Sequence, residues 1–181
     1  MSTVLEIKQL EQRFDISPGL LDRLSINDGR IRLDRHIVHA VNGIDLILER
    51  GEVMGLVGES GCGKSTVAKT IVKIYEPHRG RILIDGEDVT DYDYRKMRPI
   101  RKKVQMIFQD PFASLNPRLR VRDIVTEPLV AGREGIDKDE VKEKAMALLH
   151  RVGLGPEHAD RYPHQFSGGQ RQRIGIARAL S

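Results

Sequence analysis

The chain has little cysteine and no long apolar run. Its 181 residues include a single cysteine, Cys62, which excludes an internal disulfide framework and agrees with a reducing compartment. No stretch approaches the roughly 18 consecutive apolar residues that a membrane span requires. Residues 1–12 alternate apolar with charged side chains and lack the apolar core of a signal peptide. These absences together predict a cytosolic protein.

Aromatic residues are also scarce, at 4% of the chain, and the net charge is only +4. The densest basic cluster lies within residues 95–103, and only Tyr92, Tyr94 and Phe108 accompany it. Base stacking on a nucleic acid therefore has a thin basis, and a solvated surface is the favoured interpretation. The hydrophobic fraction of 39% and charged fraction of 31% are typical of one soluble globular domain.

Apolar periodicity predicts a mixed β and α/β core followed by a mostly helical insert. We expect single strands at residues 4–8, 81–84 and 104–108, a half-buried strand pair at 38–48, and a strand buried on both faces at 53–57. Residues 15–36 are rich in turn formers and are expected to form a loop. Helices are expected at residues 66–74, 121–130 and 137–152.

The clearest helix has its own start signal. Asp137 is a suitable N-cap, and Glu140 stands at the third helical position. Glycine and proline at residues 153–156 end the apolar pattern.

The first of two glycine-rich runs fits the phosphate-binding pattern G-x-x-x-x-G-K-[ST]. It comprises Gly58, Glu59, Ser60, Gly61, Cys62, Gly63, Lys64, Ser65 and Thr66. Glycines let backbone amides curl around a polyphosphate, and a following helix favours negative charge at its N-terminus. Lys64 can then reach the β- and γ-phosphates, and the Ser65 hydroxyl can ligate magnesium. The expected strand before the run and helix after it favour this function over a plain glycine-rich turn.

A phosphate loop alone leaves kinases, GTPases, helicases and transport ATPases open. The guanine-reading pattern N-K-x-D is absent, which lowers the GTPase option. The second glycine-rich run precedes apolar residues at helical spacing and comprises Ser167, Gly168, Gly169 and Gln170. A serine and two glycines before a helix form a second anion cradle. A second cradle is explained if it binds a γ-phosphate held by another subunit. A plain nucleotide kinase would leave residues 167–170 unexplained.

Together these runs resemble those of the ATP-binding cassette (ABC) ATPases. Residues 58–66 resemble their Walker A loop, residues 167–170 their signature motif, and Gln109 the glutamine of their Q-loop. The resemblance implies an α/β P-loop NTPase core of the ABC type, with an antiparallel β-subdomain and a helical subdomain. It implies ATP and Mg²⁺ as ligands, with Lys64 and Gln109 in catalysis and Ser65 and Gln109 at the metal.

Residues 109–118 and 161–166 resemble stretches of the dipeptide and oligopeptide importer branch, as does the excursion at 15–36. This resemblance implies uptake of peptides coupled to ATP hydrolysis. Nickel importers and ATPase-like components of phosphonate metabolism share much of the pattern. A non-transport member acting on nucleic acid or the ribosome is a further alternative, which residues 109–118 disfavour.

Two features depart from the family pattern. An aromatic residue upstream of the P-loop usually stacks on adenine; Phe14 is the strongest candidate here, with His36 and Ile37 nearer along the chain, and the role stays open. No acidic residue follows Asp160, so the Walker B aspartate, the catalytic glutamate and the switch histidine are expected beyond Ser181. The C-terminal part of the core is expected to be missing, and the chain by itself is expected to be inactive.

The resemblance also implies an organisation and a set of partners. We expect an ATP-binding core with the P-loop and β-subdomain at residues 1–108, the Q-loop and helical subdomain at 109–166, and the signature motif with its helix at 167–181. The expected partners are a second ATP-binding subunit in a head-to-tail dimer, membrane-spanning permease subunits and, indirectly, a substrate-binding protein. No nucleic acid is expected. The implied location is peripheral, at the cytoplasmic face of the cell membrane.

Overall fold

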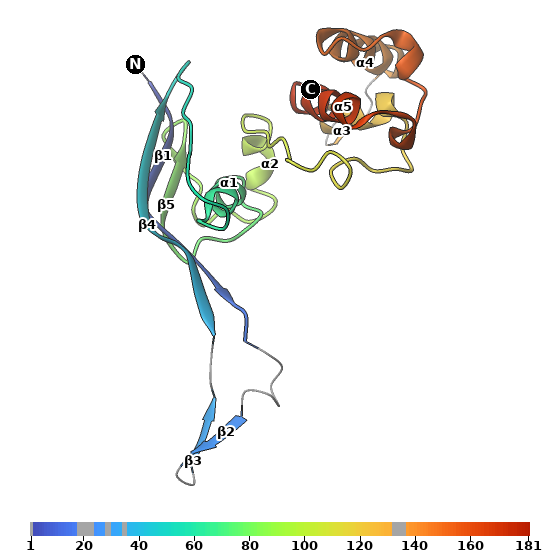
Figure 1. Cartoon of the computed structure of the whole chain (residues 1–181). Coiled ribbons are helices and arrows are strands. Elements are labelled where there is room, and N and C mark those ends of the chain that lie inside the picture. Colours follow the sequence, from blue (N-terminus) through green and yellow to red (C-terminus); the bar gives the residue numbers. More distant parts are fainter. Residues whose placement is uncertain (1, 18–23, 28–29, 34–35, 132–136) are drawn as a thin grey trace. The chain divides into compact units, whose positions relative to one another are not determined.

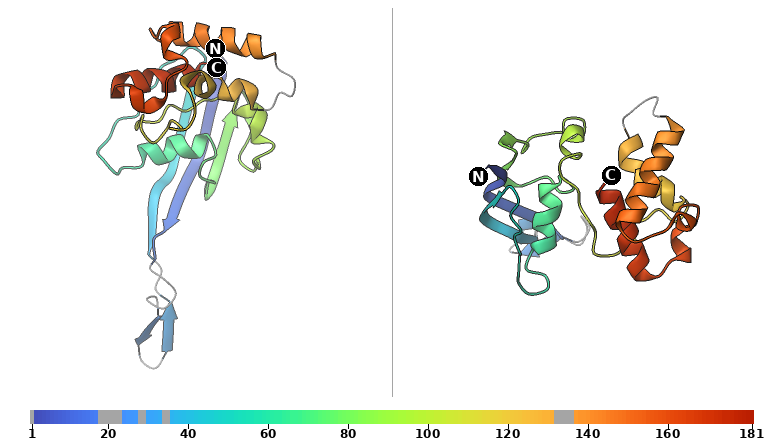
Figure 2. Two further views of the ribbon diagram at one scale, coloured as in Figure 1. Left: turned by 90° about the vertical axis from the view of Figure 1, so that its right-hand side faces the viewer. Right: turned by 90° about the horizontal axis from the view of Figure 1, so that it is seen from above.

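The computed structural model describes residues 2–17, 24–27, 30–33, 36–131 and 137–181. The chain divides into two compact units, Met1–Val104 and Gln105–Ser181, each with its own buried core. The described strands and two short helices belong to the first unit, and the three longer helices belong to the second (Figures 1 and 2).

The first unit is built on a four-stranded sheet with the order β4-β1-β5-β6. Its strands are β1 (Thr3–Asp15), β4 (Ile37–Glu49), β5 (Arg79–Ile84) and β6 (Glu87–Asp88), and all neighbours are antiparallel. The strands predicted at residues 4–8 and 81–84 are confirmed, although β1 is longer than expected. The antiparallel sheet confirms the β-subdomain that the sequence resemblance implied.

The strand pair predicted at residues 38–48 is wrong, because β4 is one continuous strand. Leu10 pairs with Ile44 and Glu11 pairs with Asn42, so Gly43 is the extra residue of a β-bulge. Gly43 has a φ of 67°, a conformation that glycine tolerates without strain. The bulge bends the strand without reversing it, which is why the alternation looked interrupted in the sequence.

The loop predicted at residues 15–36 is only partly confirmed. Within it, β2 (Leu24–Asn27) and β3 (Arg30–Leu33) pair as an antiparallel two-stranded sheet. Turn-forming residues between two short alternating segments are also the pattern of a hairpin, and that pattern prevails here. Residues 18–23, 28–29 and 34–35 of the predicted loop lie outside the described part of the chain.

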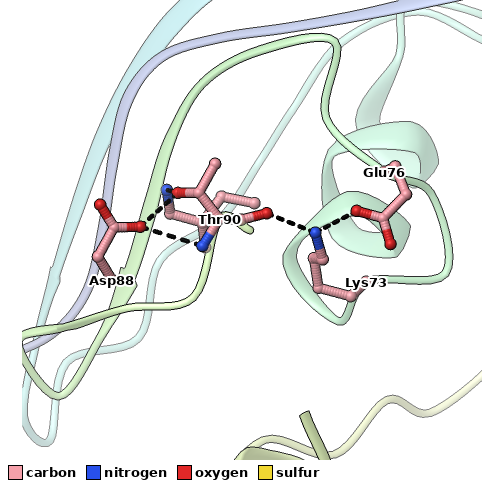
Figure 3. A network of polar contacts seen from close by, with 5 residues as sticks. Lys73, Glu76, Asp88 and Thr90 are labelled. Carbon is pink, nitrogen blue, oxygen red and sulfur yellow. Dashed lines mark hydrogen bonds and ion pairs between the residues drawn. The ribbon is translucent and has the colours of Figure 1, made fainter. Parts of the chain in front are cut away.

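Helices α1 (Lys64–Ile71) and α2 (Met97–Ile100) contribute buried side chains to the core of the first unit. The helix predicted at 66–74 is confirmed, but it ends earlier, because Lys73 adopts a left-handed backbone with a φ of 56°. The Lys73 side chain is 1% exposed, and its Nζ lies against the Glu76 carboxylate and donates to the Thr90 carbonyl oxygen at 2.5 Å (Figure 3). These contacts join the end of α1 to the segment that follows β6.

Asp88 completes this network. Its Oδ1 accepts hydrogen bonds from the Thr90 hydroxyl at 2.5 Å and from the Thr90 amide at 3.0 Å (Figure 3). These bonds favour the ionised carboxylate, so the pKa of Asp88 is lowered, chiefly by the Thr90 hydroxyl.

The strands predicted at residues 53–57 and 104–108 are wrong. Neither segment forms a strand, and Val53 and Val57 are 96% and 93% exposed. A strand buried on both faces requires neighbouring strands and covering layers. Among the described residues, none forms a ladder with either segment.

The second unit packs α3 (Val121–Val130), α4 (Lys138–Arg151) and α5 (Gly168–Ala179) around one apolar cluster. Short 3₁₀ turns at Pro156–His158 and Pro163–Gln165 connect α4 to α5. The helices predicted at 121–130 and 137–152 are both confirmed. Asp137 is the N-cap of α4, where its Oδ1 accepts a hydrogen bond from the Asp139 amide at 3.2 Å.

Candidate functional site

Of the phosphate-loop residues, 58–63 lie between the exposed segment 53–57 and helix α1, and 64–66 form the first turn of that helix. The loop ends at Gly63, the N-cap of α1, which has a φ of 98°. Gly61 also has a positive φ, at 85°. Both are conformations that residues with a Cβ rarely adopt, so the glycines are required by the path of the backbone. The path delivers the loop to the N-terminus of a helix, where peptide dipoles favour an anion.

Lys64 is the first residue of α1, and its side chain turns back over the loop. Its Nζ donates to the carbonyl oxygens of Gly58 at 2.7 Å and Glu59 at 2.6 Å. The Sγ of Cys62 lies 3.4 Å from the same nitrogen. The ammonium group is therefore held at the mouth of the loop rather than extended into solvent. If phosphate oxygens replaced these two carbonyl oxygens, the Lys64 ammonium group would still donate to oxygen acceptors.

Ser65 and Thr66 follow on the first turn of α1. Ser65 is exposed, and the Thr66 carbonyl accepts a hydrogen bond from the Thr70 hydroxyl at 2.8 Å. Glycine amides, an ammonium group and an exposed hydroxyl are the donor set that suits a polyphosphate and its magnesium ion. The chemistry of the residues therefore fits ATP with Mg²⁺.

Gln109 lies in the second unit and is exposed. The loop that follows is organised by Asp110, whose Oδ1 accepts hydrogen bonds from the amides of Phe112 at 2.8 Å and Ala113 at 3.3 Å. This local turn presents Phe112, which is 64% exposed.

The signature residues 167–170 form the start of α5. Ser167 is the N-cap, with its Oγ accepting from the Gln170 amide at 3.3 Å and its own amide donating to Gln170 Oε1 at 3.0 Å. This reciprocal pair is a capping box. A Cβ added to Gly169 would meet no atom within 4 Å, so this glycine borders open space. The anion cradle predicted at residues 167–170 therefore falls on the exposed start of α5, and its binding of an anion stays a prediction.

The arginine directly after the signature residues was not singled out in the sequence. The Arg171 guanidinium carbon lies 3.9 Å from the centroid of the Phe112 ring. Its Nε donates to the Pro163 carbonyl oxygen at 2.7 Å. The position of Arg171 directly after the signature residues could have indicated this residue. Its contact could not be predicted, because Phe112 lies far away along the chain.

Phe14, the candidate for adenine stacking, lies on β1 and pairs with Val38 of β4. Its ring meets that of Tyr75 edge-on, with the centroids 5.0 Å apart. The Tyr75 ring also contacts Lys69, whose Nζ lies 5.6 Å from the ring centroid. Phe14 is thus part of an aromatic pair beside the end of α1, and its role toward a nucleotide stays a hypothesis.

A family model for the ABC transporter matches residues 41–181, which is most of the chain. The chain belongs to the ABC transporter family. Its relatives include the oligopeptide transport ATP-binding proteins AppF and OppF of Bacillus subtilis strain 168, which are 48% and 47% identical over 99% and 98% of this chain. The di/tripeptide transport ATP-binding protein DppF of Pseudomonas aeruginosa strain UCBPP-PA14 is 43% identical over 99% of it. The chain spans about half the length of these relatives, covering 51%, 53% and 52% of them.

Solved structures agree with this assignment. The ATP-binding cassette MJ0796, in a dimeric post-hydrolysis state bound to ADP and Pi, matches with a TM-score of 0.81 at 28% identity. The match covers 97% of this ABC chain and 68% of the MJ0796 chain. CbiO1 from Clostridium perfringens, part of the ABC transporter complex cbiONQ, matches with a TM-score of 0.72 at 28% identity, over 99% of this chain and 62% of its own. The ABC cassette fold expected from the sequence is confirmed.

Within the described ranges of this ABC chain, every helix is too short or too polar to cross a membrane.

Proposed function

We propose that this chain is the ATP-binding part of an ABC importer that couples ATP binding and hydrolysis to the uptake of dipeptides or oligopeptides. Relatives named for oligopeptide and di/tripeptide transport are 43–48% identical over nearly the whole chain, which supports this proposal. The importer-like stretch at residues 109–118 supports it as well. Domains are assigned as 1–108 for the core, 109–166 for the Q-loop and helical subdomain, and 167–181 for the signature and its helix.

The subunit's own ATP binds along residues 58–66. Lys64 moves from the carbonyl oxygens of Gly58 and Glu59 to the β- and γ-phosphates. Ser65 would hold magnesium through its hydroxyl, and the resemblance to the ABC ATPases implies the same role for the Gln109 side chain. Magnesium, when bound with the nucleotide, neutralises charge that develops on the phosphate oxygens during transfer to water. The protein's contribution is to position the phosphates and to stabilise that charge.

The observation that carries the proposal is the exposed, capped first turn of α5. Ser167 and Gln170 form reciprocal hydrogen bonds there, and Gly168 and Gly169 are exposed without side chains that would block a ligand. Such a turn suits the γ-phosphate of an ATP held by a partner subunit. Two ATP molecules then lie between the P-loop of one subunit and residues 167–170 of the other. ATP favours the closed dimer because only that state adds the contacts of the second cradle.

Closure of the dimer acts on membrane-spanning permease subunits through the helical subdomain and Gln109. A substrate-binding protein delivers the peptide to the permease. The ATPase is then peripheral, at the cytoplasmic face of the cell membrane.

The test is transport. The full-length gene product is reconstituted with its permease subunits in vesicles, and ATP-dependent accumulation of a labelled tripeptide is measured, with Lys64→Ala as the inactive control. Peptide accumulation that requires both ATP and Lys64 supports the proposal. Accumulation of nickel without peptide, or purification with nucleic acid instead of a permease, would overturn it.

A further inference from the structure

The loop after Gln109 is attached to helix α5 at both ends of that helix. At the start of α5, the Phe112 ring lies under the Arg171 guanidinium group, and a Cβ added to Gly168 would be 4.0 Å from Phe112 Cε2. At the end of α5, Arg178 Nη1 donates to the Ser114 carbonyl oxygen at 2.8 Å. The loop therefore runs alongside the helix that begins with the signature residues.

Arg171 has a second set of contacts that fixes its guanidinium plane. Its Nε donates to the Pro163 carbonyl oxygen at 2.7 Å, and its Nη2 donates to the His164 carbonyl oxygen at 3.4 Å. Both acceptors belong to the 3₁₀ turn directly before Ser167. One side chain thus joins the turn that leads into the signature, the first turn of α5 and the aromatic ring after Gln109.

The rest of the loop is also fixed to the core of the second unit. Leu115 is 3% exposed and belongs to the same apolar cluster as Phe166 and Ile174. Phe112 differs because it is 64% exposed, and the Arg171 guanidinium group contacts its ring. A planar guanidinium group over an aromatic face is an attractive and direction-dependent contact.

We propose that Arg171 is a positioning residue that locks Phe112 to the signature turn, so that a displacement at Gln109 is transmitted to residues 167–170. This inference rests on the proposed function, because it concerns how one nucleotide-facing residue is linked to the cradle for the partner's nucleotide. In this proposal Arg171 acts through Phe112 and the signature turn and is not a ligand of either nucleotide. It makes the Q-loop and the signature turn move as one body.

The direct test measures this link without nucleotide. Millisecond hydrogen exchange is recorded on the full-length protein for the amides of residues 110, 112–114 and 167–170. Arg171→Gln speeds exchange at Phe112 and Ala113 by about two- to fivefold, the size expected for losing one partly exposed cation–π contact. Phe112→Leu speeds exchange at Gln170 in return. Arg171→Lys, which keeps a cation but not the planar fork, gives an intermediate effect.

Arg173→Gln is the matched control, because it removes the same charge from the same helix. In the wild-type protein Arg173 Nη1 donates to the Val152 carbonyl oxygen at 3.4 Å. Arg173→Gln leaves both amide groups at wild-type rates. Equal acceleration by Arg173→Gln, or unchanged rates in Arg171→Gln, would overturn the link.

A second measurement is the ATP concentration that half-saturates dimer formation, with binding of a fluorescent ATP analogue to the monomer measured in parallel. Arg171→Gln raises the ATP concentration that half-saturates dimer formation by several-fold. It leaves the binding of the ATP analogue to the monomer unchanged. A wild-type protein that binds ATP without dimerising would refute the proposed function, while the exchange rates would still decide the link.

Discussion

The Cα of Gly63 faces the carbonyl oxygen of Ala40 on strand β4, and a Cβ added to Gly63 would lie 2.2 Å from that oxygen. The phosphate loop is thus pressed against the backbone of the antiparallel sheet at the residue where α1 begins. The Ala40 oxygen is a backbone atom of strand β4, so it cannot swing away as the end of a flexible side chain could. This contact fixes the position of the helix N-terminus to which we assign phosphate binding.

Gly63→Ala is expected to destabilise the protein strongly. The substitution combines a φ of 98° with a backbone clash, and it should lower the free energy of unfolding by about 3 kcal/mol or more. Gly61→Ala is the control, because Gly61 has a φ of 85° but no atom within 4 Å of its added Cβ. It should cost about 1–2 kcal/mol. Urea unfolding of both variants makes the comparison; equal losses would contradict the role given to the Ala40 contact.

Lys64→Ala is expected to abolish tight ATP binding. Charge-assisted hydrogen bonds of this kind contribute about 1.5–3 kcal/mol, so the Kd for ATP should rise by about 10- to 150-fold. Isothermal titration calorimetry measures this change, with Lys102→Ala as a control that removes the same charge from an exposed position. A Lys64→Ala protein with wild-type affinity would show that the lysine does not reach the phosphates.

The Asp88 network predicts a pH dependence of stability. The folded pKa of Asp88 lies below its ordinary value of 3.8, because the Thr90 hydroxyl and amide bond the carboxylate. A lowered folded pKa means stability that is present above pH 3.8 and is lost as the pH falls through the folded pKa. Asp88→Asn should therefore flatten the loss of unfolding free energy as the pH falls below about 4. The exposed Asp91→Asn should retain the wild-type slope, and an identical slope in Asp88→Asn would contradict the assignment.

Features set by local sequence could be predicted. The N-cap Asp137 and the helix at residues 121–130 depend on residues within one turn of each other, and both appear as expected. The signature turn is similar, because Ser167 and Gln170 complete each other within a single turn. The phosphate-loop pattern likewise indicated a glycine-rich loop that leads into a helix, which is what Gly61, Gly63 and α1 form.

Features that depend on distant partners were missed. The apolar run at residues 53–57 has the composition of a buried strand, but composition does not supply the neighbouring strands that would bury it. The bulge at Gly43 depends on its register against β1, which a single strand cannot reveal. The contact between Arg171 and Phe112 joins two motifs that are far apart along the chain, so it is visible only in three dimensions.

Residues 167–170 are proposed to bind the ATP held by a partner subunit. The most direct measurement is ATP-dependent dimerisation of the full-length Gly169→Asp protein, followed by light scattering, with ATP binding to the monomer measured alongside. Open space around Gly169 should let the fold accept the side chain, while its carboxylate repels the γ-phosphate. Gly175→Ala is the control, because a Cβ added to Gly175 on the same helix likewise meets nothing within 4 Å. We predict wild-type ATP affinity with no dimer in Gly169→Asp, and a normal dimer in the control. A Gly169→Asp protein that still dimerises with ATP would contradict the account.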